Sequence, residues 1–468
     1  MSAAKVETSQ PLHVLLYPFP SSGHTIPALH LTHHLLCRNF TVTVLLLPST
    51  ATLLDSLLPL FPSSLHTLLL HPDPLPFNAP THKQDLFAKM FALRDLDPQI
   101  ISWFRSHPSP PAAVISDFFL GWTNKLASQL GIKRLVFSPS GGLALNIMNS
   151  LWLNRPDFTK PSVENPLFFS FPQLPNSPSY PASHLSDLYP EVDAGDEEWN
   201  SFTEFWSDNM ASHGFVVNSF TELEAVHLSY LKTQLGHDRV WAVGPLAPLN
   251  KHRQSRQHFE TSLFSRVMAW LDERPTGSHH SVIYVCFGSR TILTRQQMEA
   301  LSTGLDRSGV DFILCVGSDP TVDVPEGYEE RVAGRGFVIR GWAPQVAILS
   351  HRAVGSFVTH CGWNSVLEGV SAGVAMLTWP MGAEQFVNAR LLVDELGAGM
   401  RFSESGVKAP GADEVAQLAR EAVRGRGVEI RKRAVEMRAA ALTAVNGGST
   451  KMAWDDLAKS LSRLGSGF

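Results

Sequence analysis

The sequence predicts an α/β protein with two Rossmann-like domains and a cleft between them. Short apolar runs rich in β-branched residues alternate with segments of helical spacing, as they do in parallel α/β domains. This alternation stops at one polar, basic stretch and then restarts. The chain has 468 residues, more than a single hydrophobic core usually supports. Two such domains that face each other bind ligands between the carboxyl ends of their strands.

The first domain opens with an apolar strand at residues 12–17 (LHVLLY), then a loop with proline, serine and glycine, then a helical pattern at residues 27–37. Further strands are expected at residues 41–47, 112–116, 134–138 and 215–218. Residues 161–189 are crowded with proline and serine, which predicts long irregular loops of the kind that often line a site.

A leucine-rich stretch covers residues 41–70, but Pro48, Asp55, Pro59 and Pro62 interrupt it. We interpret it as a strand, a loop and a buried helix, and expect no integral membrane segment. The first ten residues are polar and lack the apolar region of a signal peptide.

The polar, basic stretch between residues 245 and 259 predicts the domain boundary. We expect an N-terminal domain at residues 1–245, a linker at 246–259 and a C-terminal domain at 260–468, whose last helix can pack back onto the first domain. Strands of the second domain are expected at residues 281–287, 312–316, 337–339, 356–359 and 375–379.

Composition excludes several classes of protein. Hydrophobic residues make up 44% of the chain and charged residues 17%, which is far from a disordered composition. The net charge of −5 gives no bulk attraction to nucleic acid or to an anionic membrane. The four cysteines are widely spaced and form no CxxC, which argues against a disulfide framework or a zinc site and favours a reducing cytoplasm.

The motif THCGWNS at residues 359–365 follows a predicted strand and opens a helix. Free backbone N–H groups and the helix dipole favour an anion at such a junction, Gly362 allows close approach, and His360 can donate to a phosphate oxygen. A pyrophosphate fits this position. Glu368 can accept hydrogen bonds from ribose hydroxyls, or Ser365 and Glu368 form the S-x-x-E capping box of an ordinary helix.

Further candidate ligand groups flank this motif. Trp342 either fills the core or forms a flat platform for a base, with Gln345 reaching a polar edge of that base. Glu384 and Gln385 lie in a loop context, where such a pair is usually solvated but can also bind several sugar hydroxyls. The turn at Gly288-Ser289 also suits a phosphate or a sugar, although an isolated FGS is weak evidence.

Residues 342–385 resemble the 44-residue signature box of plant family 1 UDP-glycosyltransferases, because WAPQ, HCGWNS, the next glutamate, WP and EQ stand in the family's order. One departure is Ala375, where the family usually has proline. The resemblance implies a GT-B fold, with the acceptor in the N-terminal domain and a UDP-sugar in the C-terminal domain. It assigns donor binding to Ser289, Trp342, Ala343, Gln345, His360, Trp363, Asn364, Ser365, Glu368, Glu384 and Gln385.

His24 lies in the first strand-to-helix loop (SSGHT), where an exposed imidazole can act as a base near neutral pH, although a lone histidine is more often structural. Asp117 ends a predicted strand and faces the same edge of the sheet, so its carboxylate can orient the imidazole. By resemblance, these residues match the family's catalytic dyad. His24 takes the proton of an acceptor hydroxyl, whose oxygen attacks the anomeric carbon with inversion as UDP leaves.

This scheme needs no cofactor and no metal ion, because the helix N-terminus and His360 neutralise the leaving diphosphate. We interpret the single D-x-D, Asp95-Leu96-Asp97, as solvated surface rather than a metal site. The histidines that share a helical face are expected to have a surface or packing role: His30, His33 and His34.

By resemblance, Gln385 goes with UDP-glucose, whereas histidine at that position often goes with galactose; xylose and rhamnose stay open as alternatives. Phe118, Phe119 and Trp122 offer aromatic surface to an acceptor, and Gly23 and Ser138 are further candidate contacts of the donor or acceptor. A flavonoid fits best, with hydroxybenzoates and terpenoid alcohols as alternatives, because the N-terminal sequence resembles a subgroup that acts on flavonols and small phenolics.

Three other functions fit the sequence less well. A nicotinamide oxidoreductase needs GxGxxG after the first strand, where PFPSSGHTIP stands, and a P-loop nucleotidase needs an absent GxxxxGK[ST]. A non-catalytic UDP-sugar-binding protein would keep the signature box and lose the dyad. Both His24 and Asp117 are present, so we expect a monomeric cytoplasmic enzyme with small-molecule partners and no nucleic acid.

Overall fold

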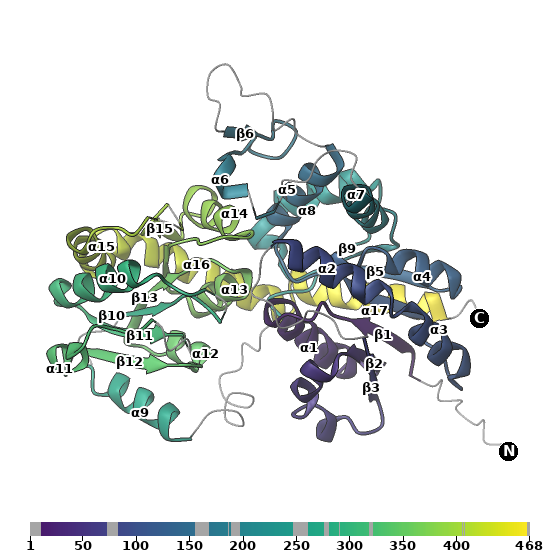
Figure 1. The fold of residues 1–468 in the computed structure, drawn as a ribbon, viewed down its shortest axis with the longest axis horizontal. Coiled ribbons are helices and arrows are strands. Elements are labelled where there is room, and N and C mark those ends of the chain that lie inside the picture. Colours follow the sequence, from purple (N-terminus) through teal and green to yellow (C-terminus); the bar gives the residue numbers. More distant parts are fainter. Residues whose placement is uncertain are drawn as a thin grey trace.

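The computed structural model describes residues 11–72, 83–154, 168–185, 187–188, 197–246, 261–275, 280–289, 291–317, 322–404, 406 and 408–465. Two parallel sheets lie side by side, each between layers of helices (Figure 1). The α/β class with two Rossmann-like domains is therefore confirmed. Of the predicted linker at 246–259, residues 247–259 lie outside the described residues.

The first sheet has seven parallel strands in the order β3-β2-β1-β4-β5-β8-β9. Its strands are β1 (His13–Tyr17), β2 (Thr41–Leu46), β3 (Leu65–Leu69), β4 (Ala113–Asp117), β5 (Lys133–Ser138), β8 (Gly214–Val217) and β9 (Val240–Ala242). Alternate residues of β1 point into two different apolar clusters, Leu15 into one and Leu16 into the other. The chain leaves β1 toward β2 on one side and returns to β4 on the other, so the switch in strand order falls between β1 and β4.

The helices of this half alternate with the strands. They are α1 (Ser22–Leu36), α2 (Lys83–Arg94), α3 (Asp97–Ser106), the short η3 (Phe118–Leu120), α4 (Thr123–Gln129), α5 (Gly142–Asn154), α7 (Glu197–Met210) and α8 (Thr221–Leu235). The first helix begins five residues before the predicted start at Pro27, because the loop turns at an extended Ser21. Within residues 161–189, the described part forms a small hairpin, β6 (Phe168–Ser170) and β7 (Ser179–Pro181), followed by α6 (Ala182–Leu185).

The predicted buried helix within residues 41–70 is wrong. After β2 the chain forms two short 3-10 helices, η1 (Pro48–Leu54) and η2 (Leu58–Leu60), and then the edge strand β3. Pro48 and Pro59 lie in the first turns of η1 and η2. A proline inside a longer helix would remove a backbone hydrogen bond and clash with the preceding turn, so one continuous helix is disfavoured here. Residues 65–69 pair in parallel with β2 instead, from Val42↔Leu65 to Leu46↔Leu69.

The second sheet has six parallel strands in the order β12-β11-β10-β13-β14-β15. They are β10 (Val282–Cys286), β11 (Asp311–Val316), β12 (Gly336–Arg340), β13 (Val354–Thr359), β14 (Ala375–Thr378) and β15 (Gly399–Arg401). The helices are α9 (Thr261–Asp272), α10 (Arg295–Ser308), α11 (Tyr328–Val332), α12 (Gln345–Leu349), α13 (Trp363–Ala372), α14 (Gln385–Arg390), α15 (Ala412–Arg424) and α16 (Gly427–Val445). Here the switch falls between β10 and β13, the two strands that precede the FGS turn and the THCGWNS motif.

The last helix, α17 (Ser449–Gly465), returns to the first sheet (Figure 1, yellow). Its Trp454 is 2% exposed and joins the apolar cluster beneath β1 and β2. The Trp454 indole donates to the carbonyl of Val243 at 3.1 Å, and the Trp241 indole donates to Asp456 at 2.7 Å. The C-terminal helix therefore completes the core of the N-terminal sheet. Among the described residues, no helix combines the length and apolarity needed to cross a bilayer.

Replacing Trp454 with alanine should destabilise the protein by about 3–5 kcal/mol, because it leaves a large cavity beside the first sheet. Met452 on the same helix is 63% exposed, so Met452→Ala should change stability by less than about 0.5 kcal/mol. Urea unfolding followed by tryptophan fluorescence and circular dichroism measures both variants. Equal effects would contradict the anchoring role of Trp454.

Candidate active site

The first turn of α1 and the last residue of β4 bring His24 and Asp117 together at the switch of the first sheet, so His24 begins a helix and does not lie in the predicted loop. The Nδ1–H of His24 donates to Oδ2 of Asp117 at 2.8 Å. The His24 side chain is 17% exposed, whereas that of Asp117 is fully buried. One imidazole nitrogen is thus held by a buried carboxylate, and Nε2 is left as the nitrogen that can accept a proton.

Asp117 is fixed by more than its contact with His24. Its Oδ1 accepts from the backbone N–H of Phe119 at 2.9 Å, and its carbonyl oxygen accepts from the guanidinium of Arg134 at 3.1 Å. Arg134 is 1% exposed, and burial lowers its pKa to about 9. Arg134 is not among the residues predicted for the site, although a lone arginine in the apolar run RLVFS is a visible signal.

Aromatic rings surround the His24 imidazole. Its ring centroid lies 5.6 Å from that of Phe19, 5.5 Å from Phe118 and 5.0 Å from Phe119, whose ring is nearly parallel. Among the candidate acceptor contacts, Phe118 and Trp122 are 2% and 3% exposed and belong to the core. Phe119 is only half-buried, so it offers more surface than they do.

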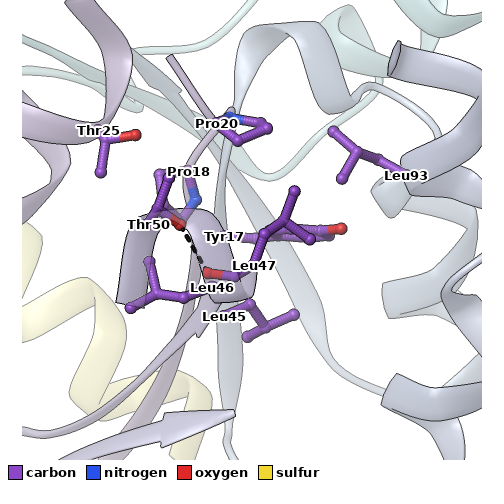
Figure 2. A pocket seen from close by; sticks show the side chains of 9 residues that line it. All are labelled: Tyr17, Pro18, Pro20, Thr25, Leu45, Leu46, Leu47, Thr50 and Leu93. Atoms are coloured by element: carbon purple, nitrogen blue, oxygen red, sulfur yellow. Dashed lines mark hydrogen bonds between the residues drawn. The ribbon is translucent and has the colours of Figure 1, made fainter. Parts of the chain in front are cut away.

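A small apolar pocket lies beside the turn that leads into α1. Figure 2 shows its lining of Tyr17, Pro18, Pro20, Thr25, Leu45, Leu46, Leu47, Thr50 and Leu93. The lining is almost entirely apolar and includes neither member of the dyad, so this pocket supports that turn rather than forming the reaction site.

The D-x-D segment is not uniformly solvated. Asp95 is 74% exposed, as expected, but Asp97 lies in the first turn of α3, where burial raises the pKa of its carboxyl to about 7. The solvated interpretation is therefore wrong for Asp97. The packing role expected for the helical histidines is confirmed for His34, whose ring stacks on Trp454 at 5.2 Å and whose pKa burial lowers to about 4.

On the donor side, His360 lies between two glycines at the junction of β13 and α13. A Cβ at Gly288 or Gly362 would approach its imidazole to 2.8 and 2.5 Å. Burial lowers the pKa of His360 to about 4. The imidazole is thus neutral at pH 7 before any ligand binds, so it offers a hydrogen bond rather than the positive charge expected from the sequence. The partial positive charge that can attract an anion here therefore comes from the N-terminus of α13.

Gln345 joins Ser365 and Glu368 into one network. Its amide nitrogen donates to the Ser365 hydroxyl at 3.1 Å and to the Glu368 carboxyl at 2.6 Å, while Tyr284 donates to its carbonyl oxygen at 3.2 Å. The helix is capped by Gly362, with Ser365 already inside it, so the capping-box alternative is wrong. Burial raises the pKa of Glu368 to about 7, against the lowering effect of the Gln345 hydrogen bond.

The remaining candidates lie on the loops around this network. Trp342 is 60% exposed, so the core-filling alternative is wrong, and Ala343 behind it is partly buried. The Gln385 side-chain oxygen accepts from the backbone N–H groups of Met381 and Gly382 at 2.8 and 3.0 Å. This leaves the Gln385 amide nitrogen as a donor, with Glu384 next to it at the start of α14.

Contacts across the domain interface bring the two sets of residues together. The Ser22 and Ser289 hydroxyls are 3.2 Å apart, and the Asn364 amide donates to the carbonyl of Gly23 at 3.2 Å. The first turn of α1, which carries His24, therefore touches the donor motif directly.

Two candidates are placed inside the protein. The Trp363 indole is 3% exposed and donates to the carbonyl of Asn218 at 2.7 Å, across the interface. The Ser138 hydroxyl is fully buried and donates to the carbonyl of Ser140 at 2.8 Å. Neither side chain is exposed toward a ligand in this conformation.

Replacing Glu368 with glutamine should stabilise the ligand-free protein at pH 7 and above. The folded pKa of about 7 lies above the usual 4.5. The carboxyl therefore favours folding fully below pH 4.5, and this contribution is lost as the pH rises through 7. The melting temperature of Glu368→Gln should match the wild type near pH 4.5 and exceed it by roughly 2–4 °C at pH 8. A calorimetric difference that does not vary with pH would contradict the buried-charge explanation.

The family model described as UDP-glucoronosyl and UDP-glucosyl transferase matches residues 268–412. The chain is 45% identical over 456 residues to flavonol 3-O-glucosyltransferase UGT89B1 of Arabidopsis thaliana, covering 92% of each protein. It is 46% identical over 422 residues to UDP-glycosyltransferase 89B2 of Stevia rebaudiana, covering 87% of this chain and 88% of the relative.

Solved structures give the same result. Arabidopsis thaliana UGT89C1 complexed with UDP-L-rhamnose matches with a TM-score of 0.78 and 33% identity, covering 97% of this chain and 100% of that chain. UGT89C1 complexed with quercetin matches with a TM-score of 0.76 and the same identity, covering 97% of this chain and 100% of that one. The shared fold is GT-B, and the likeness extends over nearly the whole chain. The protein therefore belongs to the plant family 1 UDP-glycosyltransferases, which transfer a sugar from a UDP-sugar to a small molecule.

Proposed function

We propose that this UDP-glycosyltransferase transfers glucose from UDP-glucose to a hydroxyl of a flavonol, with inversion at the anomeric carbon. The observation that carries the proposal is the His24–Asp117 pair, joined at 2.8 Å, together with the start of α1, which touches the donor motif at Ser289 and Asn364. A base next to the donor motif distinguishes an enzyme from a protein that only binds UDP-sugars.

His24 acts as the general base in this proposal. Its Nε2 takes the proton of the acceptor hydroxyl while the oxygen forms a bond to the anomeric carbon, and the bond from that carbon to the UDP oxygen breaks. Asp117 keeps the Nδ1 proton in place and stabilises the imidazolium as it forms. Inversion follows because the acceptor oxygen attacks from the face opposite to UDP.

The donor is bound from the base to the sugar along one edge of the second sheet. Trp342 stacks on the uracil with Ala343 and Gln345 beside it, Glu368 accepts from the ribose hydroxyls, and Glu384 and Gln385 bind the sugar. The diphosphate lies at the N-terminus of α13, with contacts from Ser289, His360, Trp363, Asn364 and Ser365. The 60% exposure of Trp342 supports the stacking role. Because the Trp363 indole is committed to Asn218, Trp363 acts through its backbone N–H.

Glucose is favoured over other sugars by Gln385 and by the activity of a relative, the Arabidopsis flavonol 3-O-glucosyltransferase at 45% identity. Rhamnose is the second candidate, because UGT89C1 was solved with UDP-L-rhamnose and matches at 33% identity. A flavonol acceptor is supported by the same 45% relative and by the exposed part of Phe119 beside His24. Phe118, Trp122, Gly23 and Ser138 then act as supports of the acceptor site.

We further propose that residues 1–245 form the acceptor domain and 260–468 the donor domain, in a monomer that needs no metal ion. In the described ranges, no group of three or more histidine, cysteine, aspartate or glutamate side chains is arranged to hold one, and the assay below tests the point with a chelator. All four cysteines are free, which supports a reducing compartment such as the cytoplasm.

Removal of the base should lower turnover without weakening the nucleotide site. His24→Ala is expected to reduce kcat by about 10²- to 10⁴-fold, while the Kd for UDP measured by calorimetry stays unchanged. Asp117→Asn keeps an acceptor for the Phe119 N–H but loses the charge that stabilises the imidazolium, so kcat falls as well. His33→Ala, on the same helix, is the matched control. Full turnover by His24→Ala would overturn the dyad assignment.

A donor-by-acceptor screen with chelator present tests the rest of the proposal. Mass spectrometry should detect one added hexose on a flavonol with UDP-glucose, and much less product with UDP-galactose, UDP-xylose or UDP-rhamnose. Gln385→His should lower kcat/KM for UDP-glucose by roughly tenfold. A deoxyhexose product from UDP-rhamnose would favour the second candidate, and tight UDP binding without any product would favour a binding protein.

A further inference from the structure

A segment of the N-terminal half lies on the donor half beside α14 (Figure 1). This segment, residues 176–187, is called the strap; it contains β7 and α6, and residue 186 is outside its described part. The strap contacts α14 through its middle. Its two ends contact the residues that precede and follow that helix.

The contacts of the strap follow the donor helix along its length. The His184 ring stacks on Phe386 with centroids 4.0 Å apart and an interplanar angle of 16°. The Arg390 guanidinium lies over the Tyr180 ring at 5.0 Å and donates to the carbonyl of Ser179. Beyond α14, the Asn176 amide donates to Glu395 at 2.9 Å.

At the other end, the strap reaches the loop that presents Glu384 and Gln385. The Asp187 Oδ2 accepts from the backbone N–H of Ala383 at 3.1 Å. The two preceding N–H groups, of Met381 and Gly382, both donate to the side-chain oxygen of Gln385. The three successive backbone N–H groups of residues 381–383 therefore donate to two side chains. Gln385 belongs to the C-terminal half and Asp187 to the N-terminal half.

The backbone of this loop depends on those contacts. Ala383 has a φ of 49°, a left-handed conformation that is unfavourable for alanine and persists where neighbouring contacts impose it. The Asp187 carboxylate lies so close to Gly382 that a Cβ there would be 2.3 Å from its Oδ2. Without Asp187, the loop can relax, and the Gln385 oxygen that accepts from the same loop moves with it.

We propose that Asp187 is a positioning residue for the donor sugar: by accepting from the Ala383 N–H, it holds the loop 381–385 so that Glu384 and Gln385 face the sugar. The proposal rests on the sugar-binding role of Glu384 and Gln385 stated above. It makes sugar recognition depend on the acceptor domain, because Asp187 belongs to that domain. Asp187 has no part in binding the uracil, ribose or diphosphate.

The test compares binding of UDP with binding of UDP-glucose. Asp187→Ala should raise the Kd and KM for UDP-glucose roughly three- to tenfold, the range expected for one lost hydrogen bond, and leave the Kd for UDP unchanged. Asp187→Asn keeps an oxygen that accepts from Ala383 and should restore most of the wild-type values. A purely structural role would weaken both ligands or lower the melting temperature instead.

Asn176→Gly is the matched control, because it removes a strap contact to Glu395 while glycine tolerates the φ of 63° at that position. It should leave the KM for UDP-glucose unchanged. Gly382→Ala should reproduce the defect of Asp187→Ala, and the double variant should be little worse than either single one, because both break one contact. Additive defects would contradict the shared contact.

Gln385→Ala separates this inference from the proposed function. If Gln385→Ala leaves the KM for UDP-glucose unchanged, the sugar-binding role of the loop is wrong. If Gln385→Ala raises it and Asp187→Ala does not, the sugar-binding role stands and the positioning role of Asp187 is overturned.

Discussion

The site depends on one contact between the two domains, which Trp363 makes. The Trp363 indole enters the N-terminal half, donates to the carbonyl of Asn218, and packs so closely on Gly141 that a Cβ there would be 2.5 Å from its ring. Trp363 also opens the helix whose N-terminus is the proposed diphosphate site. The same residue therefore belongs to both the helix N-terminus and the domain interface.

The topology explains why the reacting groups meet where they do. Each sheet has a switch in strand order, between β1 and β4 in one and between β10 and β13 in the other. At such a switch the loops diverge and leave room for a ligand. His24, Asp117, Ser289 and Asn364 lie at or just beyond the carboxyl ends of the four strands at the two switches, and the Ser22–Ser289 and Asn364–Gly23 contacts join them. The function thus arises from two similar halves placed edge to edge.

Burial decides the charge of the polar groups in the site. His360 is neutral and Glu368 is close to half-protonated at pH 7 because burial disfavours the charged form of each. In the proposed donor site, a bound diphosphate and ribose would give further partners to both groups. Glu368 already accepts from the Gln345 amide in the ligand-free protein.

The sequence by itself determined the fold class, ten of the thirteen strands of the two described parallel sheets to within two residues, and the segment that carries the donor motif, but it missed β3, β9 and β15. This was achievable because strand and helix periodicity and the spacing of the motif are local properties of the chain. Tertiary structure decided the rest. Ser365 and Glu368 fit a capping-box pattern, but that pattern does not reveal where a helix begins, and Gly362 begins it.

Trp363, Arg134 and Asp187 each act through a partner far away in the chain: Asn218, Asp117 and Ala383. No local pattern encodes those pairs, because only the folded domains bring them within hydrogen-bonding distance. The local sequence therefore determined which chemical groups lie near the candidate site, and packing between the domains decided which of them are exposed and which are buried against a distant partner.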